Sequence, residues 1–127
     1  MKLRCTRDSV RIRIRKSELG QLGTAHEISE RVCFGPGNEL HFGLKIEDEI
    51  EALKADFANG RIMISIPNKQ AEHWFKPQEV GIEAQIAVSD DRQLHILIEK
   101  DFPCNDREGE DKSDTFWELA SESPDAC

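Results

Sequence analysis

Five arginines near the start of the chain form the clearest candidate for a functional surface: Arg4, Arg7, Arg11, Arg13 and Arg15. The last three alternate with apolar residues, so a strand would present them on one face. A row of guanidinium groups can contact phosphates or enter a major groove, and such binding weakens as salt rises. The alternative, which we favour, is that these side chains form ion pairs that fix strand register and improve solubility. Their partners would then be Glu47, Glu49, Glu51 or the acidic C-terminal residues.

A metal site is the second candidate, because His95, Asp101 and Cys104 lie close together in the sequence, with Asp106 as a further oxygen ligand. Zinc accepts nitrogen, sulfur and oxygen ligands, but a structural site needs four of them in a tetrahedron. The spacing is irregular and only one thiol is near, which favours a solvated loop with an incidental cysteine. We therefore expect no cofactor, with zinc as the open alternative.

Catalysis has little support in the residue pattern. Nucleophilic chemistry needs a thiolate or hydroxyl beside a base, and neither Cys33 nor Cys104 has a histidine nearby in the sequence. The chain has no glycine-rich phosphate loop, and its 25 acidic residues offer no distinct pair for acid–base work. The sequence favours a protein that is not an enzyme and leaves that question open.

Charge is distributed unevenly along the 127 residues, whose formal net charge is −8. Residues 1–16 carry seven bases and one acid, whereas residues 99–127 carry three bases and ten acids. Any binding of nucleic acid would therefore have to use the N-terminal residues. Four cysteines without a C-x-x-C pair, no secretory signal and no long apolar stretch predict a cytoplasmic protein with reduced thiols and no membrane association.

The elements that position these groups are predicted by the alternation of apolar and polar residues. It indicates strands near residues 3–5, 10–14, 28–34, 40–46, 53–57, 62–66, 82–88 and 94–98. Ile28, Val32 and Phe34 share the apolar face of the third strand. Asn59-Gly60 is the strongest hairpin turn. Two short helices are expected, one capped by Ser17 and one starting at Pro67 with Asn68 as a possible cap, and Trp74 and Phe75 of the second would fill one end of the core.

The two halves of the chain repeat each other. Val10, Ile12 and Ile14 match residues 52 positions later, and beyond the helix the shift becomes 54, so that His41 matches His95. The two histidines could meet across the axis that relates the halves. A single half would leave an apolar face bare, whereas two halves can bury those faces against each other.

We therefore predict an α+β, mostly antiparallel β fold, in which duplicated ββαββ units form a pseudo-twofold barrel or sandwich with two short helices. One domain covers residues 1–102, with half-units 1–48 and 50–101. Residues 103–127 are predicted to be an acidic, flexible tail, because they hold many acids and few large apolar groups. Phe116 and Trp117 in this tail either dock back onto the domain or serve as a partner motif.

The chain as a whole resembles a bacterial family of small cytoplasmic proteins of unknown function. The resemblance rests on Met1–Arg4, on Val10–Ile14 running into Ser17-Glu18, on Phe34-Gly35, on Glu99–Phe102 with Cys104, and on Asp114–Phe116. It implies no activity, since that family has none assigned. Residues 60–100, with a strand ending in Ile66-Pro67, a helix and a hairpin, are similar to the swapped-hairpin barrel unit of AbrB-type regulators, which also occurs in tandem in MraZ-type regulators. That similarity implies a fold alone.

The function that we expect is that of a non-catalytic cytoplasmic binding module for an unidentified protein partner. The first alternative is a DNA-binding regulator that uses Arg11, Arg13 and Arg15. The second is a small metal-dependent enzyme around His95 and Cys104. Homo-oligomerisation and the exchange of hairpins between the halves are left open by the sequence.

Overall fold

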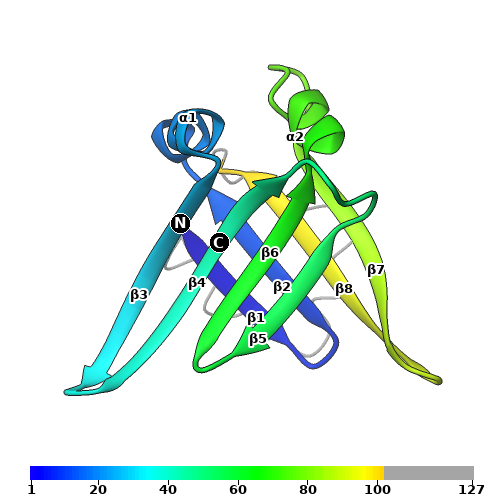
Figure 1. The fold of residues 1–127 in the computed structure, drawn as a ribbon. Coiled ribbons are helices and arrows are strands. Elements are labelled where there is room, and N and C mark those ends of the chain that lie inside the picture. The colour runs from blue at the N-terminus through cyan, green and yellow to red at the C-terminus, as the bar shows by residue number, and fades with distance from the viewer. Residues whose placement is uncertain (102–127) are drawn as a thin grey trace, which may run out of the picture.

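A computed structural model describes residues 1–101 and contains two four-stranded sheets with two short helices (Figure 1). The first half comprises β1 (Lys2–Thr6), β2 (Ser9–Ile14), α1 (Lys16–Ala25), β3 (Glu27–Gly35) and β4 (Asn38–Glu47). The second half comprises β5 (Lys54–Ala58), β6 (Arg61–Pro67), α2 (Asn68–Trp74), β7 (Gly81–Ser89) and β8 (Arg92–Lys100). All eight predicted strands are present in four hairpins.

Each sheet combines a hairpin from one half of the chain with a hairpin from the other. Sheet A has the strand order β1-β2-β8-β7, and sheet B has the order β3-β4-β6-β5. The hairpins are antiparallel, and the two halves join through the parallel pairs β2–β8 and β4–β6. The halves are therefore interlocked, which is the exchange that the sequence left open.

The strand registers confirm the internal duplication. Val10 lies opposite Ile96 in sheet A, and their equivalents Ile62 and Phe42 lie opposite each other in sheet B. In the same way, Ile12 pairs with Ile98 and Ile64 pairs with Leu44, at the predicted shifts of 52 and 54 residues. Residues 1–101 thus form two equivalent, packed sheets, which is the sandwich alternative of the predicted fold class and not a closed barrel.

The core lies where the inner faces of the two sheets overlap. Its fully buried strand residues are Ile12, Ile14, Leu44, Ile64, Ile66, Ile96 and Ile98. The helices close one end of this core (Figure 1), and Leu22 of α1 and its equivalent Trp74 of α2 are both buried. The indole N–H of Trp74 donates to the carbonyl of Val80 at 3.2 Å, so the buried ring keeps a hydrogen-bond partner. Trp74 occupies the place predicted for it.

The predicted helix caps need correction. The N-cap of α1 is Arg15, and Ser17 lies inside the helix. The carboxylate of Glu18 accepts the backbone N–H of Arg15 at 2.8 Å, so that Glu18 and not the serine hydroxyl satisfies one of the free N–H groups at this end of the helix. The N-cap of α2 is Pro67, and Asn68 is the first helical residue. Within residues 1–101, neither helix is long and apolar enough to cross a membrane.

Two hairpins extend beyond the overlap of the sheets. The strands of the two sheets cross, so that the turn ends of β3–β4 and β7–β8 reach outward on opposite sides of the molecule (Figure 1). Ile28 is buried as its pattern predicts, but Phe34, at the register shift between Cys33 and Gly35, is 72% exposed. The predicted apolar face of this strand is therefore buried at Ile28 only, and the outer end of the strand is uncovered.

Candidate interaction surfaces

The outer surface of β1–β2 carries five cations, which we call the basic face: Lys2, Arg4, Arg7, Arg11 and Arg13. Arg7 lies in the turn between the two strands. The register places Lys2 opposite Arg13 and Arg4 opposite Arg11. Like charges directly opposite each other on a sheet destabilise it unless counter-charges lie nearby.

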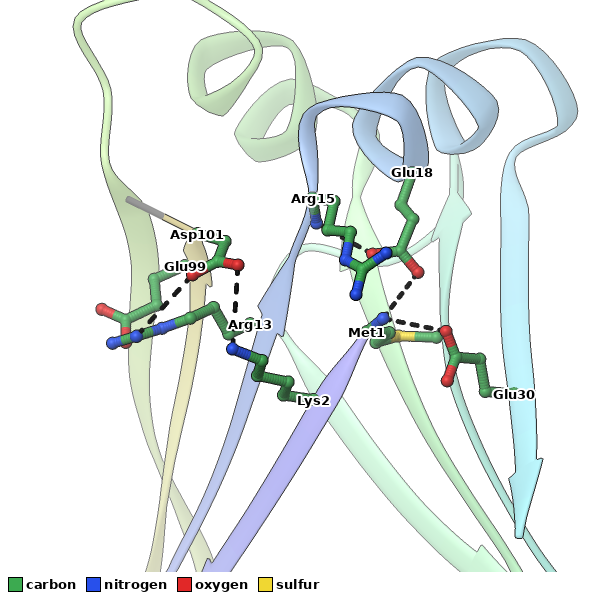
Figure 2. Close-up of polar contacts among 8 residues, drawn as sticks. All are labelled: Met1, Lys2, Arg13, Arg15, Glu18, Glu30, Glu99 and Asp101. Atoms are coloured by element: carbon green, nitrogen blue, oxygen red, sulfur yellow. Dashed lines mark hydrogen bonds and ion pairs between the residues drawn. The ribbon is translucent and has the colours of Figure 1, made fainter. Parts of the chain in front are cut away.

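The counter-charges come from β8 and the residue that follows it (Figure 2). Glu99 lies opposite Arg13 in the parallel pair and accepts a hydrogen bond from its guanidinium at 2.8 Å, while Arg11 lies 3.6 Å from the same carboxylate. Asp101 lies 3.8 Å from Arg13 and 3.9 Å from Lys2. The expected ion pairing is present, and among the described residues its partners are Glu99 and Asp101, not Glu47. Glu47 belongs to sheet B and bonds to Lys45 at 2.7 Å.

The predicted arginine row is divided by the fold. Arg11 and Arg13 are partly buried, with side chains 27% and 15% exposed. Arg4 and Arg7 are exposed, and neither forms an ion pair within the part of the chain that the structure describes. Arg15 leaves the row, because it is the N-cap of α1. The residues open to a partner are thus Lys2, Arg4 and Arg7.

A second charged cluster surrounds the amino terminus (Figure 2). The α-amino group of Met1 donates to Glu18 at 2.7 Å and to Glu30 at 2.8 Å, which ties β1 to α1 and β3. Burial lowers the pKa of this amino group, but the hydrogen bonds to both carboxylates outweigh burial and raise the pKa above 8.0. Burial raises the pKa of Glu18, but the bonds from Met1 and Arg15 outweigh it and hold that pKa below 4.5. In this cluster one cation bridges two carboxylates from different elements, which gives it a structural role.

The two equivalent histidines lie on the outer faces of different sheets. His41 of sheet B bonds to Glu39 at 3.1 Å, and His95 of sheet A bonds to Glu83. Each ring thus has a glutamate of its own sheet as partner, and the structure does not bring the two histidines together.

The residues proposed for a metal site are also spread out. Asp101 follows His95 by six positions of nearly extended chain, a distance of roughly 20 Å. Cys104 lies outside the described residues, as do Phe116 and Trp117. Within residues 1–101, no group of three histidine, cysteine or acidic side chains could hold a metal ion.

The outer ends of the two long hairpins form a surface that the sequence did not single out. We call them the apolar tips, formed by Val32 and Phe34 on β3 and by their equivalents Ile86 and Val88 on β7. Phe34 is 72% exposed and Val88 is 58% exposed. Beside the first tip, Arg31 and Glu39 form an ion pair at 3.6 Å, which reduces the local charge.

A signal for the apolar tips exists in the strand lengths. β3 and β4 span nine and ten residues, whereas β1 and β2 span five and six. Strands of such different length cannot cover each other end to end when their sheets pack. The excess length could therefore have been predicted to leave an apolar face open.

The comparisons with known proteins identify one family. The model of a family of unknown function (DUF7009) matches residues 1–119, which is nearly the whole chain. No curated protein matches the chain. No solved structure matches it either.

Proposed function

The chain belongs to this family of unknown function, and from that premise we propose that the protein is a non-catalytic binding module that acts through a protein partner. The observation that carries the proposal is the exposure of Phe34 at the first apolar tip. We place the module in the cytoplasm, because Cys5 and Cys33 are free and exposed, as suits a reducing compartment.

An exposed apolar tip favours a protein partner over other classes of macromolecule. Large apolar side chains at a protruding, uncovered site mark interaction surfaces in soluble proteins. Both halves of the duplicated chain keep this feature, since Ile86 and Val88 occupy the places of Val32 and Phe34. The tips lie on β3 and β7, which are edge strands with unpaired backbone groups. A partner strand could add to such an edge while its apolar side chains cover the tip.

The test replaces Phe34 by serine in the full-length chain. Because the ring is exposed, the free energy of unfolding is expected to change by no more than about 0.5 kcal/mol. Binding to the partner is expected to fall by at least about tenfold, because a buried aromatic anchor contributes about 2 kcal/mol or more to an interface. The measurement is quantitative cross-linking of tagged protein in its native cells, followed by mass spectrometry.

Phe57→Ser is the matched control. Phe57 is 70% exposed, nearly as much as Phe34, but it lies on β5 at the opposite edge of sheet B. Proteins that are lost with Phe34→Ser and kept with Phe57→Ser support the proposal. Identical sets of captured proteins for both variants would refute it. Sedimentation velocity of the same variants shows whether the partner is a second copy of this chain.

A duplex-binding regulator is the second candidate, and the exposure of Arg4 and Arg7 favours it. Each phosphate contact adds about 0.9 to the slope of log affinity against log salt. Arg4→Ser is therefore expected to weaken duplex binding and to reduce the magnitude of this slope by about 0.9, the value for one phosphate contact. Arg13, which is held by Glu99, cannot reach a phosphate without breaking its ion pair. Equal binding by wild type and Arg4→Ser would remove this candidate.

A further inference from the structure

Because the fold is duplicated, the basic face of β1–β2 can be compared with the equivalent face of β5–β6. A shift of 52 residues places Lys54, Asp56, Met63 and Ser65 of β5–β6 at the positions of Lys2, Arg4, Arg11 and Arg13. The second hairpin forms the same ladder with one base and one acid. Four stacked cations are therefore not required by the backbone, by the register or by packing in this fold. Their concentration on one hairpin needs an electrostatic explanation of its own.

The described counter-charges do not balance this face. Glu99 and Asp101 lie beside Arg13 and Lys2, at the end of the hairpin near α1. Arg4 lies opposite Arg11, whose neighbour on β8 is the uncharged Leu97. Arg4 and Arg7 are exposed at the other end of the hairpin, so an anionic occupant fits there.

The chain itself continues from the edge of this face. The backbone N–H of Asp101 donates to the carbonyl of Ile14 at 2.7 Å, and its carboxylate lies beside Lys2 and Arg13. The next 26 residues, 102–127, hold eight acids and only two bases. Their first acid, Asp106, is five residues away, which allows a reach of about 17 Å in an extended chain. That length equals the span of the five-residue strand β1.

We propose that residues 103–127 bind in cis to the basic face, with their carboxylates beside Arg4 and Arg7. A tethered segment has an effective concentration of about 1 mM, so a set of ion pairs with a dissociation constant below that value keeps the site mostly occupied. Any anionic macromolecule must then displace the segment before it binds. This inference is independent of the apolar tips, because it concerns the outer face of sheet A and different residues.

The experiment uses the full chain and removes four negative charges from the segment: Asp106→Asn, Glu108→Gln, Glu110→Gln and Asp111→Asn. The matched control removes four exposed negative charges elsewhere: Asp56→Asn, Glu72→Gln, Asp90→Asn and Asp91→Asn. Both variants change the net charge equally. Backbone amide shifts of residues 2–13 report on the basic face, and the indole N–H signal of Trp117 reports on the segment.

The proposal predicts that the segment variant shifts the amide signals of Arg4 and Arg7 at low salt, and that high salt shifts the wild type in the same direction. The control variant is expected to leave these signals in place. Arg4→Ser should in turn shift the Trp117 signal. Unchanged β1–β2 signals in the segment variant would overturn the proposal.

Binding of short duplex DNA tests whether nucleic acid, instead of the segment, occupies the basic face. With the segment bound in cis, its neutralisation is expected to raise duplex affinity by about tenfold more than the control variant does. No duplex binding by any variant, together with the predicted shifts, assigns the face to the segment alone and supports the proposal. Equal affinities of the segment variant and the control would show that nucleic acid meets an open face, which contradicts the proposal.

Discussion

At the scale of single residues, the α-amino group of Met1 acts as a structural cation. It bonds to Glu18 and Glu30, and Glu18 also accepts the backbone N–H that starts α1. One carboxylate therefore links the beginning of the chain to the first helix. Such a link depends on the charges of both groups, so its contribution to stability must depend on pH.

The first prediction concerns that pH dependence. Because folding raises the pKa of the Met1 amino group, its contribution is complete below pH 8.0 and is lost as pH rises through the raised pKa. Because folding lowers the pKa of Glu18, its contribution is complete above pH 4.5 and is lost as pH falls through the lowered pKa. Urea unfolding between pH 4 and pH 10 is expected to show a stability maximum between these limits.

Glu18→Gln tests the origin of this profile. It is expected to lower the free energy of unfolding at neutral pH by about 1 kcal/mol and to flatten the alkaline decline. The chain has no tyrosine, so no phenol titrates in that range. Glu30→Gln is the control and should have a smaller effect, because the Glu30 side chain is 43% exposed. An unchanged alkaline decline in Glu18→Gln would assign it to other groups.

The second prediction concerns the ion pair between Arg13 and Glu99. Arg13→Met leaves the mostly buried Glu99 carboxylate without its closest cation, and is expected to cost about 2 kcal/mol of unfolding free energy. Arg4→Met is expected to change stability by no more than about 0.5 kcal/mol, because Arg4 is exposed and lies opposite another arginine. Urea unfolding measures both. Equal losses would mean that the ion pair has no special role.

At the scale of elements, two glycines allow the long hairpins to form. A Cβ atom on Gly43 of β4 would lie 2.4 Å from the carbonyl oxygen of Ile28, and one on Gly81 of β7 would lie 2.5 Å from that of Ile98. Gly81 also lies opposite Glu99, where an added Cβ would lie 3.2 Å from the Cα and Cβ atoms of that residue. These strands therefore approach more closely than a side chain permits.

The third prediction follows from these contacts. Gly43→Ala and Gly81→Ala are each expected to lower the free energy of unfolding by about 2 kcal/mol, because backbone atoms must move. Gly20→Ala in α1 is the control. Nothing lies within 4 Å of its added Cβ, and alanine favours a helix, so a gain of about 0.5 kcal/mol is expected. Thermal unfolding that ranks the three variants otherwise would contradict the strand contacts.

At the scale of the whole molecule, the exchange of hairpins makes each half depend on the other. The central strand β2 of the first half pairs with β8, and β4 pairs with β6. Neither half can complete a four-stranded sheet by itself. Because these central strands carry the fully buried isoleucines, a separated half would expose most of its core.

The fourth prediction concerns the separated halves, residues 1–50 and 51–127. Neither fragment is expected to fold as a monomer, and an equimolar mixture is expected to recover the sheet signal in circular dichroism. Residues 1–50 could also pair with a second copy of themselves, because their β2 and β4 fit the equivalent positions of both sheets. Sedimentation velocity distinguishes these assemblies. A fragment that is a stable, folded monomer would contradict the exchanged pairing.

The internal repeat lets much of the fold be predicted from the sequence. Alternation of Ile12 and Ile14 with arginines, and the matching spacing of Ile62, Ile64 and Ile66, identify strands and their inner faces, because side chains alternate on a strand. The turn at Asn59-Gly60 is also local, and both residues have the positive φ angles that this pair favours. Local chemistry and periodicity therefore determined the elements, the duplication and the cations of β1–β2.

Only the tertiary structure decided which elements meet. The parallel pairing of β2 with β8 places Glu99 beside Arg13, although 86 residues separate them in the sequence, so no local pattern could indicate that counter-charge. The crossing of the two sheets leaves the turn end of β3–β4 uncovered (Figure 1), and Phe34 there is exposed while Ile28 near the other end of β3 is buried. Alternation tells which way a side chain points from its strand. What covers that side chain depends on packing between elements that are far apart in the sequence. No short segment of the sequence contains that information.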